Sequence, residues 1–376
     1  MVFRYLPGLL SGVRSLTVAC VLGAPALAAP VKPPVVGKAP ATRRGALDAE
    51  AAMYLGSPQT EAAVDRGLAY LAKVQAADGS WSGEGNGSDV GIVGLTVMSY
   101  LSAGHQPDRG KYGEVLRKAT DYLCKQSQST GLICNPARNA GPPMYGHGFA
   151  TLALAELWGM TRRPDLRDKL DRAVRLIIST QNSQGGWRYQ PRVEDADISV
   201  TICQIMALRA AANAGLAVPE ATTDKAIAYV KLCSNKKDGG FVYQGPNGPS
   251  GQARTGAGVL ALLIMGERES PECRRGLEYL AKVTPGNFNE HWAYAAYYCT
   301  QAMYQEGGEP WHAWYPKMSS VLLDKQKKEG YWDMEGVGRA YCTAMSILSL
   351  QIPSGLLPVY QRLSPHGEQP RPGAPK

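Results

Sequence analysis

The chain has 376 residues, 44% of them hydrophobic, with 42 glycines and 26 prolines. This composition excludes a collagen-like or compositionally disordered chain and provides enough apolar residues for a sizeable core. The net charge of +8 comes without a basic cluster interleaved with aromatic residues, so nucleic acid is not an expected partner. The 19 Tyr and 7 Trp against only 4 Phe favour buried rings that keep a polar group near a cavity.

The N-terminal segment has the features of a secretory signal. Residues 1–28 contain Arg4 and Arg14, no acid, an apolar run at 16–24 and a small-residue cleavage site ending at Ala28. The run is too short to span a bilayer, so the mature chain is expected to have no transmembrane segment, with peripheral membrane contact left open. We therefore predict a secreted or periplasmic protein, whose net charge falls to +6 when the signal is removed. A Pro/Ala-rich linker is predicted at 29–60.

A repeat of roughly 50 residues organises the remainder. Its first copy, at 66–81, reads Arg-Gly-x-x-Tyr-Leu and closes with Gln75, Gly79 and Trp81. Weaker copies begin at Lys118, Arg172, Lys225, Arg275 and Val321. Each copy predicts an amphipathic helix, a glycine-containing turn and a second helix.

The second helices are expected to be buried because they are apolar on nearly every face. They are predicted at 90–101, 149–158, 198–212, 256–265, 292–304 and 340–350. Six pairs with exposed first helices and buried second helices can close into a double ring. The predicted fold is all-α, a single-domain α/α toroid of six helical hairpins, an (α/α)6 barrel, at 61–362, followed by a flexible tail at 363–376.

The repeat resembles that of squalene cyclases and of the β subunits of protein prenyltransferases. The similarity covers about 64–361 and is most specific in the first, third and sixth copies. It implies that the repeated Gln and Trp tie helix ends to neighbouring turns, so they are interpreted as structural braces. It also implies a hydrophobic, isoprenoid ligand. Squalene cyclases resemble two toroids with the site between them, and this chain has one.

An acidic motif at the head of the third buried helix gives the sharpest chemical hypothesis. The run from Glu194 to Ser199 resembles the Asp-x-Asp-Asp-Thr motif of squalene cyclases, with Ile198 and Ser199 replacing its last two residues. The resemblance implies that Asp197 protonates the isoprenoid and that Asp195 adjusts the acidity of Asp197. The alternative is a helix N-cap, because Asp89 occupies the same helix-start position in the first repeat.

Metal chemistry is not expected. The prenyltransferase β subunits hold zinc with an Asp-x-Cys pair and a distant His, and this chain has no Asp-x-Cys. Cys203, Cys299 and Cys342 occupy equivalent positions on three buried helices, where small core side chains are common. We predict no cofactor and no metal. Seven cysteines remain after signal removal, and Cys124 with Cys134 is the first disulfide to test.

Aromatic and histidine side chains gather where the buried helices begin. The predicted ligand-pocket residues are Tyr145, His147, His291, Tyr294, Tyr298 and Tyr341. Their rings suit an apolar or cationic ligand.

The predicted function is an exported protein that binds a hydrophobic, isoprenoid molecule in the toroid cavity. Its enzymatic version is a terpene cyclase or mutase-like intramolecular transferase. The alternative is a non-catalytic extracytoplasmic binding or scaffold protein whose partner is another protein or a glycan.

Overall fold

The computed structural model describes residues 56–83, 87–88, 90–138 and 142–362, which lie in one compact unit, Leu47–Lys376. The predicted signal peptide, the predicted C-terminal tail and most of the predicted linker lie outside these residues. In the described ranges, no helix is both long and apolar enough to cross a membrane.

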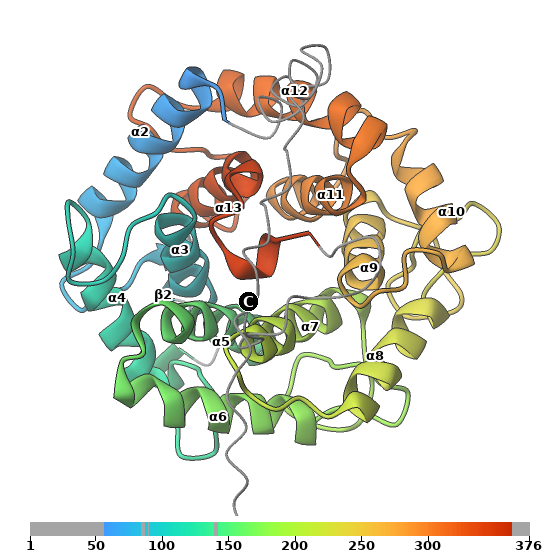
Figure 1. The fold of residues 1–376 in the computed structure, drawn as a ribbon, viewed down its shortest axis with the longest axis horizontal. Coiled ribbons are helices and arrows are strands. Elements are labelled where there is room, and N and C mark those ends of the chain that lie inside the picture. The colour runs from blue at the N-terminus through green and yellow to red at the C-terminus, as the bar shows by residue number, and fades with distance from the viewer. Residues whose placement is uncertain (1–55, 84–86, 89, 139–141, 363–376) are drawn as a thin grey trace, which may run out of the picture. The chain divides into compact units, whose positions relative to one another are not determined.

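Two concentric rings of helices confirm the predicted α/α toroid (Figure 1). The outer ring comprises α2 (Pro58–Val74), α4 (Gly113–Gln126), α6 (Pro164–Ser179), α8 (Glu220–Leu232), α10 (Pro271–Leu280) and α12 (Gly308–Lys325). The inner ring comprises α3 (Val90–Ser102), α5 (Pro143–Thr161), α7 (Ile198–Asn213), α9 (Gln252–Ile264), α11 (Trp292–Glu306) and α13 (Arg339–Gln351). The smaller elements are β1 (Ser82–Gly83), β2 (Gly87–Ser88), η1 (Pro136–Arg138), η2 (Ile352–Ser354) and η3 (Pro358–Tyr360).

The two rings differ in burial as the sequence predicts. The outer helix α6 buries one face, with Leu166, Leu170 and Ile177 among its buried residues, whereas every residue of the inner helix α3 is buried. The inner helix α5 begins earlier than the predicted 149–158 because Pro143, at its first turn, fits a helix start. Hydrophobic burial on both sides of the inner ring therefore holds the toroid together.

Glycines let the inner helices approach one another closely. A Cβ added at Gly94 of α3 would lie 2.7 Å from the carbonyl oxygen of Phe149 on α5. A Cβ at Gly256 of α9 would lie 2.6 Å from the Sγ of Cys299 on α11. These separations are shorter than ordinary van der Waals contact, so glycine is required at both positions.

The repeated glutamines of the first, third and sixth units brace each of these units against the next, as the resemblance implies. Gln75 donates to the carbonyl oxygens of Gly79 at 3.1 Å and of Val115, in the next unit, at 2.9 Å. Gln181 makes the same pair of bonds, to Gly185 and Thr222, both at 2.9 Å.

The last unit is joined to the first by the same contacts. Gln326 donates to the carbonyl oxygens of Gly330 at 2.9 Å and of Ala63 at 2.8 Å. Gly330 also packs against the first unit, since a Cβ there would lie 2.4 Å from the carbonyl oxygen of Arg66. The braces therefore close the ring.

The repeated tryptophans of the first, third and sixth units brace those units internally. The indole N–H groups of Trp81, Trp187 and Trp332 donate to the carbonyl oxygens of Leu71, Ile177 and Leu322 at 2.7–2.8 Å. All three indoles are almost fully buried. The interpretation of the repeated residues as structural braces is confirmed.

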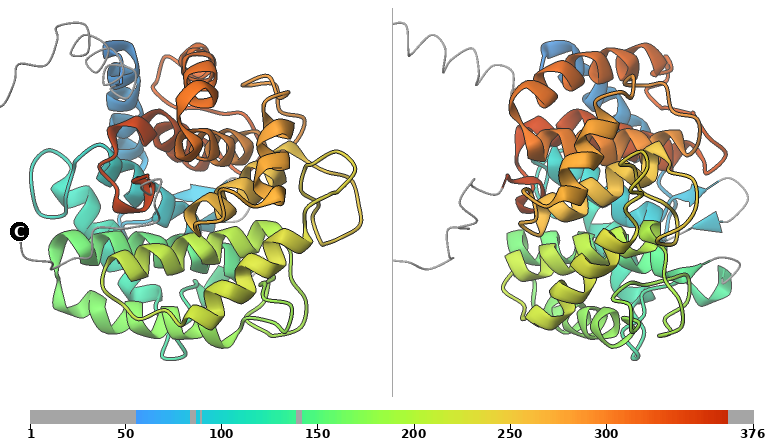
Figure 2. Two further views of the ribbon diagram at one scale, coloured as in Figure 1. Left: turned by 45° about the vertical axis from the view of Figure 1, so that its right-hand side comes forward. Right: turned by 90° about the vertical axis from the view of Figure 1, so that its right-hand side faces the viewer.

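The toroid has two unlike ends (Figure 2). At one end, which we call the cavity end, long connections run from each outer helix to the start of its inner helix. At the other, the closed end, short connections lead back outward, and the segment 352–362 packs across the centre of the ring.

Three polar contacts hold η3 at the closed end. The backbone N–H of Val359 donates to Glu156 Oε1 at 3.1 Å. The carbonyl oxygen of Tyr360 accepts from the Gln305 side chain at 3.0 Å, and the hydroxyls of Tyr360 and Tyr297 lie 3.0 Å apart. Burial raises the pKa of Glu156 to about 7.

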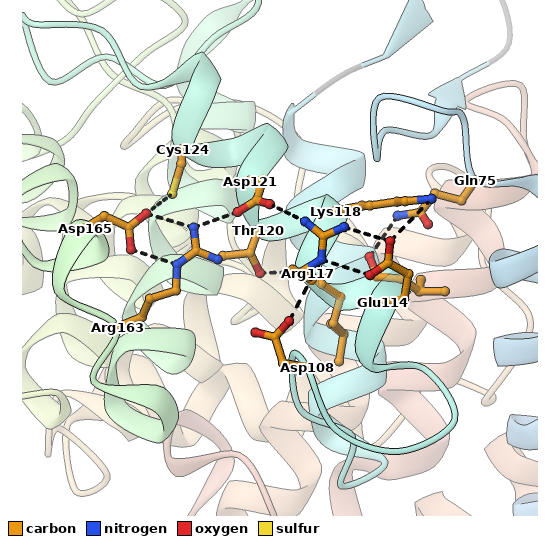
Figure 3. Close-up of polar contacts among 12 residues, drawn as sticks. Gln75, Asp108, Glu114, Arg117, Lys118, Thr120, Asp121, Cys124, Arg163 and Asp165 are labelled. Carbon is orange, nitrogen blue, oxygen red and sulfur yellow. Dashed lines mark hydrogen bonds and ion pairs between the residues drawn. The ribbon is translucent and has the colours of Figure 1, made fainter.

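Charged side chains join two outer helices on the surface (Figure 3). Arg163 bridges Asp121 of α4 and Asp165 of α6, each at 2.7 Å, and Arg117 pairs with Asp121 at 3.0 Å. Exposed ion pairs of this kind contribute little individually, typically about 0–1 kcal/mol each. The network therefore aligns the outer helices rather than forming a site.

The proposed disulfide between Cys124 and Cys134 is wrong, because both thiols are free. The Sγ of Cys124 lies 3.7 Å from an Asp165 oxygen, and the Sγ of Cys134 accepts from the Gln128 amide at 2.9 Å. The two residues are close in sequence, on either side of one turn, but their side chains contact different partners.

Candidate functional site

A cavity of about 700 Å³ opens at the cavity end of the toroid. Its wall includes residues from the first turns of all six inner helices and from the loops before them. The lining comprises Gly83, Gly91, Ile92, Leu95, Tyr145, Gly146, Phe149, Tyr189, Ser199, Tyr243, Ala253, Arg254, Glu290, His291, Tyr294, Glu335, Gly336, Val337 and Tyr341. The closure of the ring thus brings residues that are distant in sequence to one space.

One side of the cavity is aromatic and aliphatic. Ile92 and Leu95 of α3 lie there with Phe149 of α5. Tyr145 packs against Tyr189 with ring centroids 6.0 Å apart, and the Tyr189 hydroxyl contacts that of Tyr243. This side can accept apolar or ring-bearing groups.

The other side carries charge. Arg254 of α9 pairs with Glu290 at 3.2 Å, which leaves the pair formally neutral. Glu335 accepts a hydrogen bond from the backbone N–H of Ala293, in the first turn of α11, at 3.2 Å. Burial raises the pKa of Glu335, although neighbouring backbone N–H groups oppose this shift. His291 precedes α11 with φ 47°, a left-handed backbone conformation.

Three tyrosines reach the cavity from different inner helices. Tyr294 of α11 donates to the carbonyl oxygen of Ser199 at 3.4 Å. Tyr145 lies on α5 and Tyr341 on α13. Burial raises the pKa of all three well above its ordinary value, so each hydroxyl keeps its proton at neutral pH.

Asp197 is the N-cap of α7, which confirms the capping interpretation. Its Oδ1 accepts from the backbone N–H groups of Ser199 and Val200, both at 2.9 Å. Its Oδ2 lies 3.7 Å from Nε of Arg188. The side chain is fully buried and is not among the cavity-lining residues. Burial raises its pKa to about 6, against the opposing effects of the capping bonds and Arg188.

Asp195 lies on the surface, with a side chain 57% exposed, where it pairs with Arg188. Arg188 thus contacts both predicted acidic residues, and its guanidinium also stacks over the ring of Tyr189 at 4.9 Å. Both aspartates contact Arg188, which stacks on the lining residue Tyr189. The two aspartates therefore lie behind the cavity wall rather than in it. Asp89, the predicted counterpart in the first repeat, falls outside the described residues.

A family model for the squalene-hopene cyclase C-terminal domain matches residues 149–306. This match agrees with the observed toroid and with the bracing Gln, Gly and Trp residues described above. The chain is a squalene-cyclase-like α/α toroid. A comparison with curated protein sequences found no match.

Solved structures similar to this squalene-cyclase-like toroid show the same fold at low identity. One is the type II terpene cyclase MstE from Scytonema, a variant in complex with geranylgeranyl dihydroxybenzoate, with 14% identity and a TM-score of 0.56. The match covers 80% of this chain and 98% of that one.

Two further neighbours are carbohydrate-active proteins. The GH76 α-mannanase from Bacteroides thetaiotaomicron has 11% identity and a TM-score of 0.61, covering 78% of this chain and 95% of its own. Cellobiose 2-epimerase from Bacillus thermoamylovorans has 12% identity and a TM-score of 0.58, covering 76% and 95%. The fold therefore hosts several chemistries, and this toroid's function has to be argued from its own cavity.

The structure places four of the six predicted pocket residues on the cavity wall, namely Tyr145, His291, Tyr294 and Tyr341. The other two lie behind it. Tyr298 is fully buried, with its hydroxyl 3.5 Å from Cys203 Sγ. His147 is also fully buried, and its Nδ1 accepts from the backbone N–H of Ile133 at 3.1 Å. Ligand contact by any of the six stays a prediction.

His147 has a structural counterpart in other repeats. The Thr201 hydroxyl accepts from the backbone N–H of Trp187, and the Thr255 hydroxyl accepts from that of Phe241. In each case the acceptor follows the donor by the same sequence interval as His147 follows Ile133. The position of His147 in the repeat, which matches that of the two threonine acceptors, therefore indicates that its side chain supports a turn.

Sequence reasoning missed several lining residues, chiefly Phe149, Tyr189, Tyr243, Arg254, Glu290 and Glu335. Glu290 and Glu335 could have been found, since both lie just before an inner helix, as Asp197 does. Tyr189 and Tyr243 lie in the connections before α7 and α9, whose paths differ from repeat to repeat.

The inner-helix cysteines do not form a metal site. In the part of the chain that the structure describes, no group of three or more His, Cys, Asp or Glu side chains is placed to hold a metal ion. The Sγ atoms of Cys203 and Cys299 contact backbone carbonyl oxygens at 3.3 and 3.5 Å, and burial raises the pKa of both thiols to about 12. They are protonated packing residues rather than thiolates.

Proposed function

We propose that this toroid binds a hydrophobic small molecule of isoprenoid character in the cavity at its cavity end, and that it acts outside the cytoplasm. The observation that carries the proposal is the wall itself, where tyrosines from different elements surround a space of about 700 Å³. That volume lies within the usual range of ligand pockets, about 300–1,000 Å³. The predicted signal at 1–28 supports the location.

The aliphatic residues favour an apolar ligand over a fully polar one. Ile92, Leu95 and Phe149 form a continuous apolar side with Tyr145. Burying an alkyl chain against this side would contribute about 25 cal/mol per Å² of apolar surface removed from water. The terpene cyclase with the same fold holds a geranylgeranyl-bearing substrate, which supports an isoprenoid rather than another hydrocarbon.

The geometry supports binding more directly than acid-initiated cyclisation by Asp197 and Asp195. One Asp197 oxygen is committed to two capping bonds, and the side chain does not reach the cavity surface. Glu335 does line the cavity, and the other lining carboxyl, Glu290, is paired with Arg254, so Glu335 is the acid that we assign to a terpene cyclase or mutase-like reaction there. Incubation with squalene and shorter polyprenes would then give product that Glu335→Gln abolishes and Asp197→Asn leaves.

The scaffold alternative gains no specific support. The exposed large hydrophobic residues of the described chain are Val74, Val193, Leu232, Val337 and Leu356. They lie on different elements and form no contiguous patch of the kind that marks a protein interface.

Blocking the cavity tests the proposal. Gly336 lines the cavity, and a Cβ added there meets nothing within 4 Å, so Gly336→Trp should fold while filling the ligand space. We expect at least a tenfold loss of affinity for farnesene and squalene, measured by calorimetric titration.

Gly159→Trp is the matched control. Gly159 is equally unobstructed and lies away from the cavity, on α5. Equal affinities in both variants and the parent protein, or no binding by any of them, would refute the proposal.

A further inference from the structure

Two of the cavity tyrosines have no hydrogen-bond partner among the residues that the structure describes. Tyr294 donates to the carbonyl oxygen of Ser199. Within the described residues, by contrast, no hydrogen bond satisfies the hydroxyl of Tyr145 or of Tyr341. Neither oxygen is among the fully buried polar atoms that lack a partner, so both remain accessible from the cavity that they line.

These two tyrosines line the same cavity from α5 and α13, the two inner helices that flank α3. Tyr145 starts α5 and Tyr341 starts α13, and each lies within electrostatic reach of Cys203 and of the other. Burial keeps both phenols protonated, so each offers an O–H donor. The cavity thus presents two unused donors beside its apolar side.

A pure hydrocarbon would satisfy neither donor. It would exclude solvent from these hydroxyls and leave both O–H groups without an acceptor, which is unfavourable for each one. A ligand with an acceptor oxygen at that point would avoid this cost. A site built around a hydrogen bond rejects analogues that lack the partner atom, so the unused donors are a source of specificity.

The surrounding charges favour an uncharged acceptor. Glu335 interacts electrostatically with Tyr341, and the Arg254 guanidinium is already paired with Glu290 at 3.2 Å. A carboxylate on the ligand would approach these two acidic side chains, and among the described lining residues no unpaired Lys or Arg would balance its charge. A carbonyl oxygen accepts two hydrogen bonds and carries no charge.

We propose that Tyr145 and Tyr341 donate hydrogen bonds to a neutral carbonyl oxygen of the ligand, whose class is an apolar ketone, ester or quinone. This inference rests on the proposed function, because it assumes that the cavity holds a hydrophobic molecule. It adds a polar atom, the carbonyl oxygen, by which the cavity would distinguish this ligand from a pure hydrocarbon.

Three probes with one carbon skeleton test the inference. Methyl farnesoate carries a neutral ester carbonyl, farnesoic acid carries a carboxylate, and farnesene carries no oxygen. Calorimetric titration of the full-length protein at neutral pH should show the ester binding about tenfold tighter than farnesene, as expected for a buried hydrogen bond. The acid should bind more weakly than the ester.

Removal of single hydroxyls identifies the donors. Tyr145→Phe and Tyr341→Phe should each weaken ester binding about fivefold and leave farnesene binding equal or tighter. The double variant should bind ester and hydrocarbon equally. Tyr331→Phe is the control, since Tyr331 packs against Tyr70 away from the cavity.

The outcomes separate the two proposals. If farnesene binds as tightly as the ester, or if the Phe variants lose both ligands in parallel, the carbonyl inference is overturned and the proposed function stands. If the acid binds tightest, the neutral class is wrong. If none of the three probes binds, the inference and the proposed function are both overturned.

Discussion

The cavity end and the closed end of the toroid are built from the same helices but differ in how the chain connects them. At the cavity end, residues 180–197 join α6 to α7, whereas at the closed end residues 214–219 join α7 to α8. The longer connections carry Tyr189, Tyr243 and Glu335 into the cavity. The shorter ones leave a gap that the C-terminal segment fills. Loop length therefore decides which end carries the cavity.

Both ends nevertheless depend on a buried carboxyl group. Asp197 accepts two backbone N–H bonds at the start of α7, and Glu156 accepts one from Val359 of η3. Burial raises the pKa of each. The difference lies in what each anchors, since Asp197 fixes a helix behind the cavity wall and Glu156 fixes the segment that closes the ring.

The largest expected effect contrasts glycines from the two ends. Gly185, at the cavity end, has φ +100°, and a Cβ there would lie 2.0 Å from the carbonyl oxygen of Lys225. Gly215, at the closed end, has φ +89° with nothing within 4 Å. Gly185→Ala should lower the free energy of unfolding by about 3–5 kcal/mol, and Gly215→Ala by about 1–2 kcal/mol. Urea denaturation would measure both, and equal losses would contradict the brace at Gly185.

The second prediction concerns the closed end and pH. The folded-state pKa of Glu156 is raised from 4.5 to about 7, so its favourable contribution is complete below pH 4.5 and is lost as pH rises through 7. Glu156→Gln keeps an acceptor for Val359 and cannot ionise. Between pH 4.5 and 8, the wild-type stability should fall by about 3 kcal/mol relative to the variant. Parallel pH profiles in thermal unfolding would rule this out.

The corresponding prediction at the cavity end has a lower pH range. The pKa of Asp197 is raised from 3.8 to about 6, so stability is lost as pH rises from 3.8 through 6. Relative to Asp197→Asn, the wild type should lose about 2–3 kcal/mol over this range. Denaturant unfolding at a series of pH values would test it, and parallel profiles for the wild type and Asp197→Asn would contradict it.

The smallest effect is the loss of one brace. Gln181→Ala removes hydrogen bonds to Gly185 and Thr222 and should cost about 1–2 kcal/mol. The exposed Gln184→Ala, in the same turn, should change stability by less than about 0.5 kcal/mol. Chemical denaturation of both variants would decide, and indistinguishable midpoints would show that Gln181 does not join the units.

The fold could be predicted because the braces recur in the sequence. Gln75, Gln181 and Gln326 stand at the same repeat position. The repeat predicted the pairs of helices, and the apolar residues that follow predicted that the second helix of each pair is buried. The family resemblance then supplied their role. The disulfide chosen for testing is absent because nearness in sequence does not fix where two side chains point: Cys124 contacts Asp165 of α6, whereas Cys134 contacts Gln128 in the loop after α4.

The cavity could be predicted only in part. Tyr145, Tyr294 and Tyr341 were found because they begin inner helices, and helix starts converge when a ring closes. Tyr189 and Tyr243 were missed since their positions follow from loop paths that no repeat specifies. His147 was grouped with the pocket by its residue type, although its repeat position matched the threonine acceptors that support a turn.

The contact between the sixth and first units has a consequence for how the protein comes apart. A linear array of helical pairs frays from its terminal members, because each of them has only one neighbour. Here Gln326 reaches Ala63 with the same bond that Gln75 and Gln181 make inside the chain. Every helical pair thus has two neighbours, and separating any two adjacent pairs requires breaking a closed ring. The contacts between neighbouring helical pairs should therefore not depend on where the chain begins and ends. A circularly permuted chain should keep all six of these contacts.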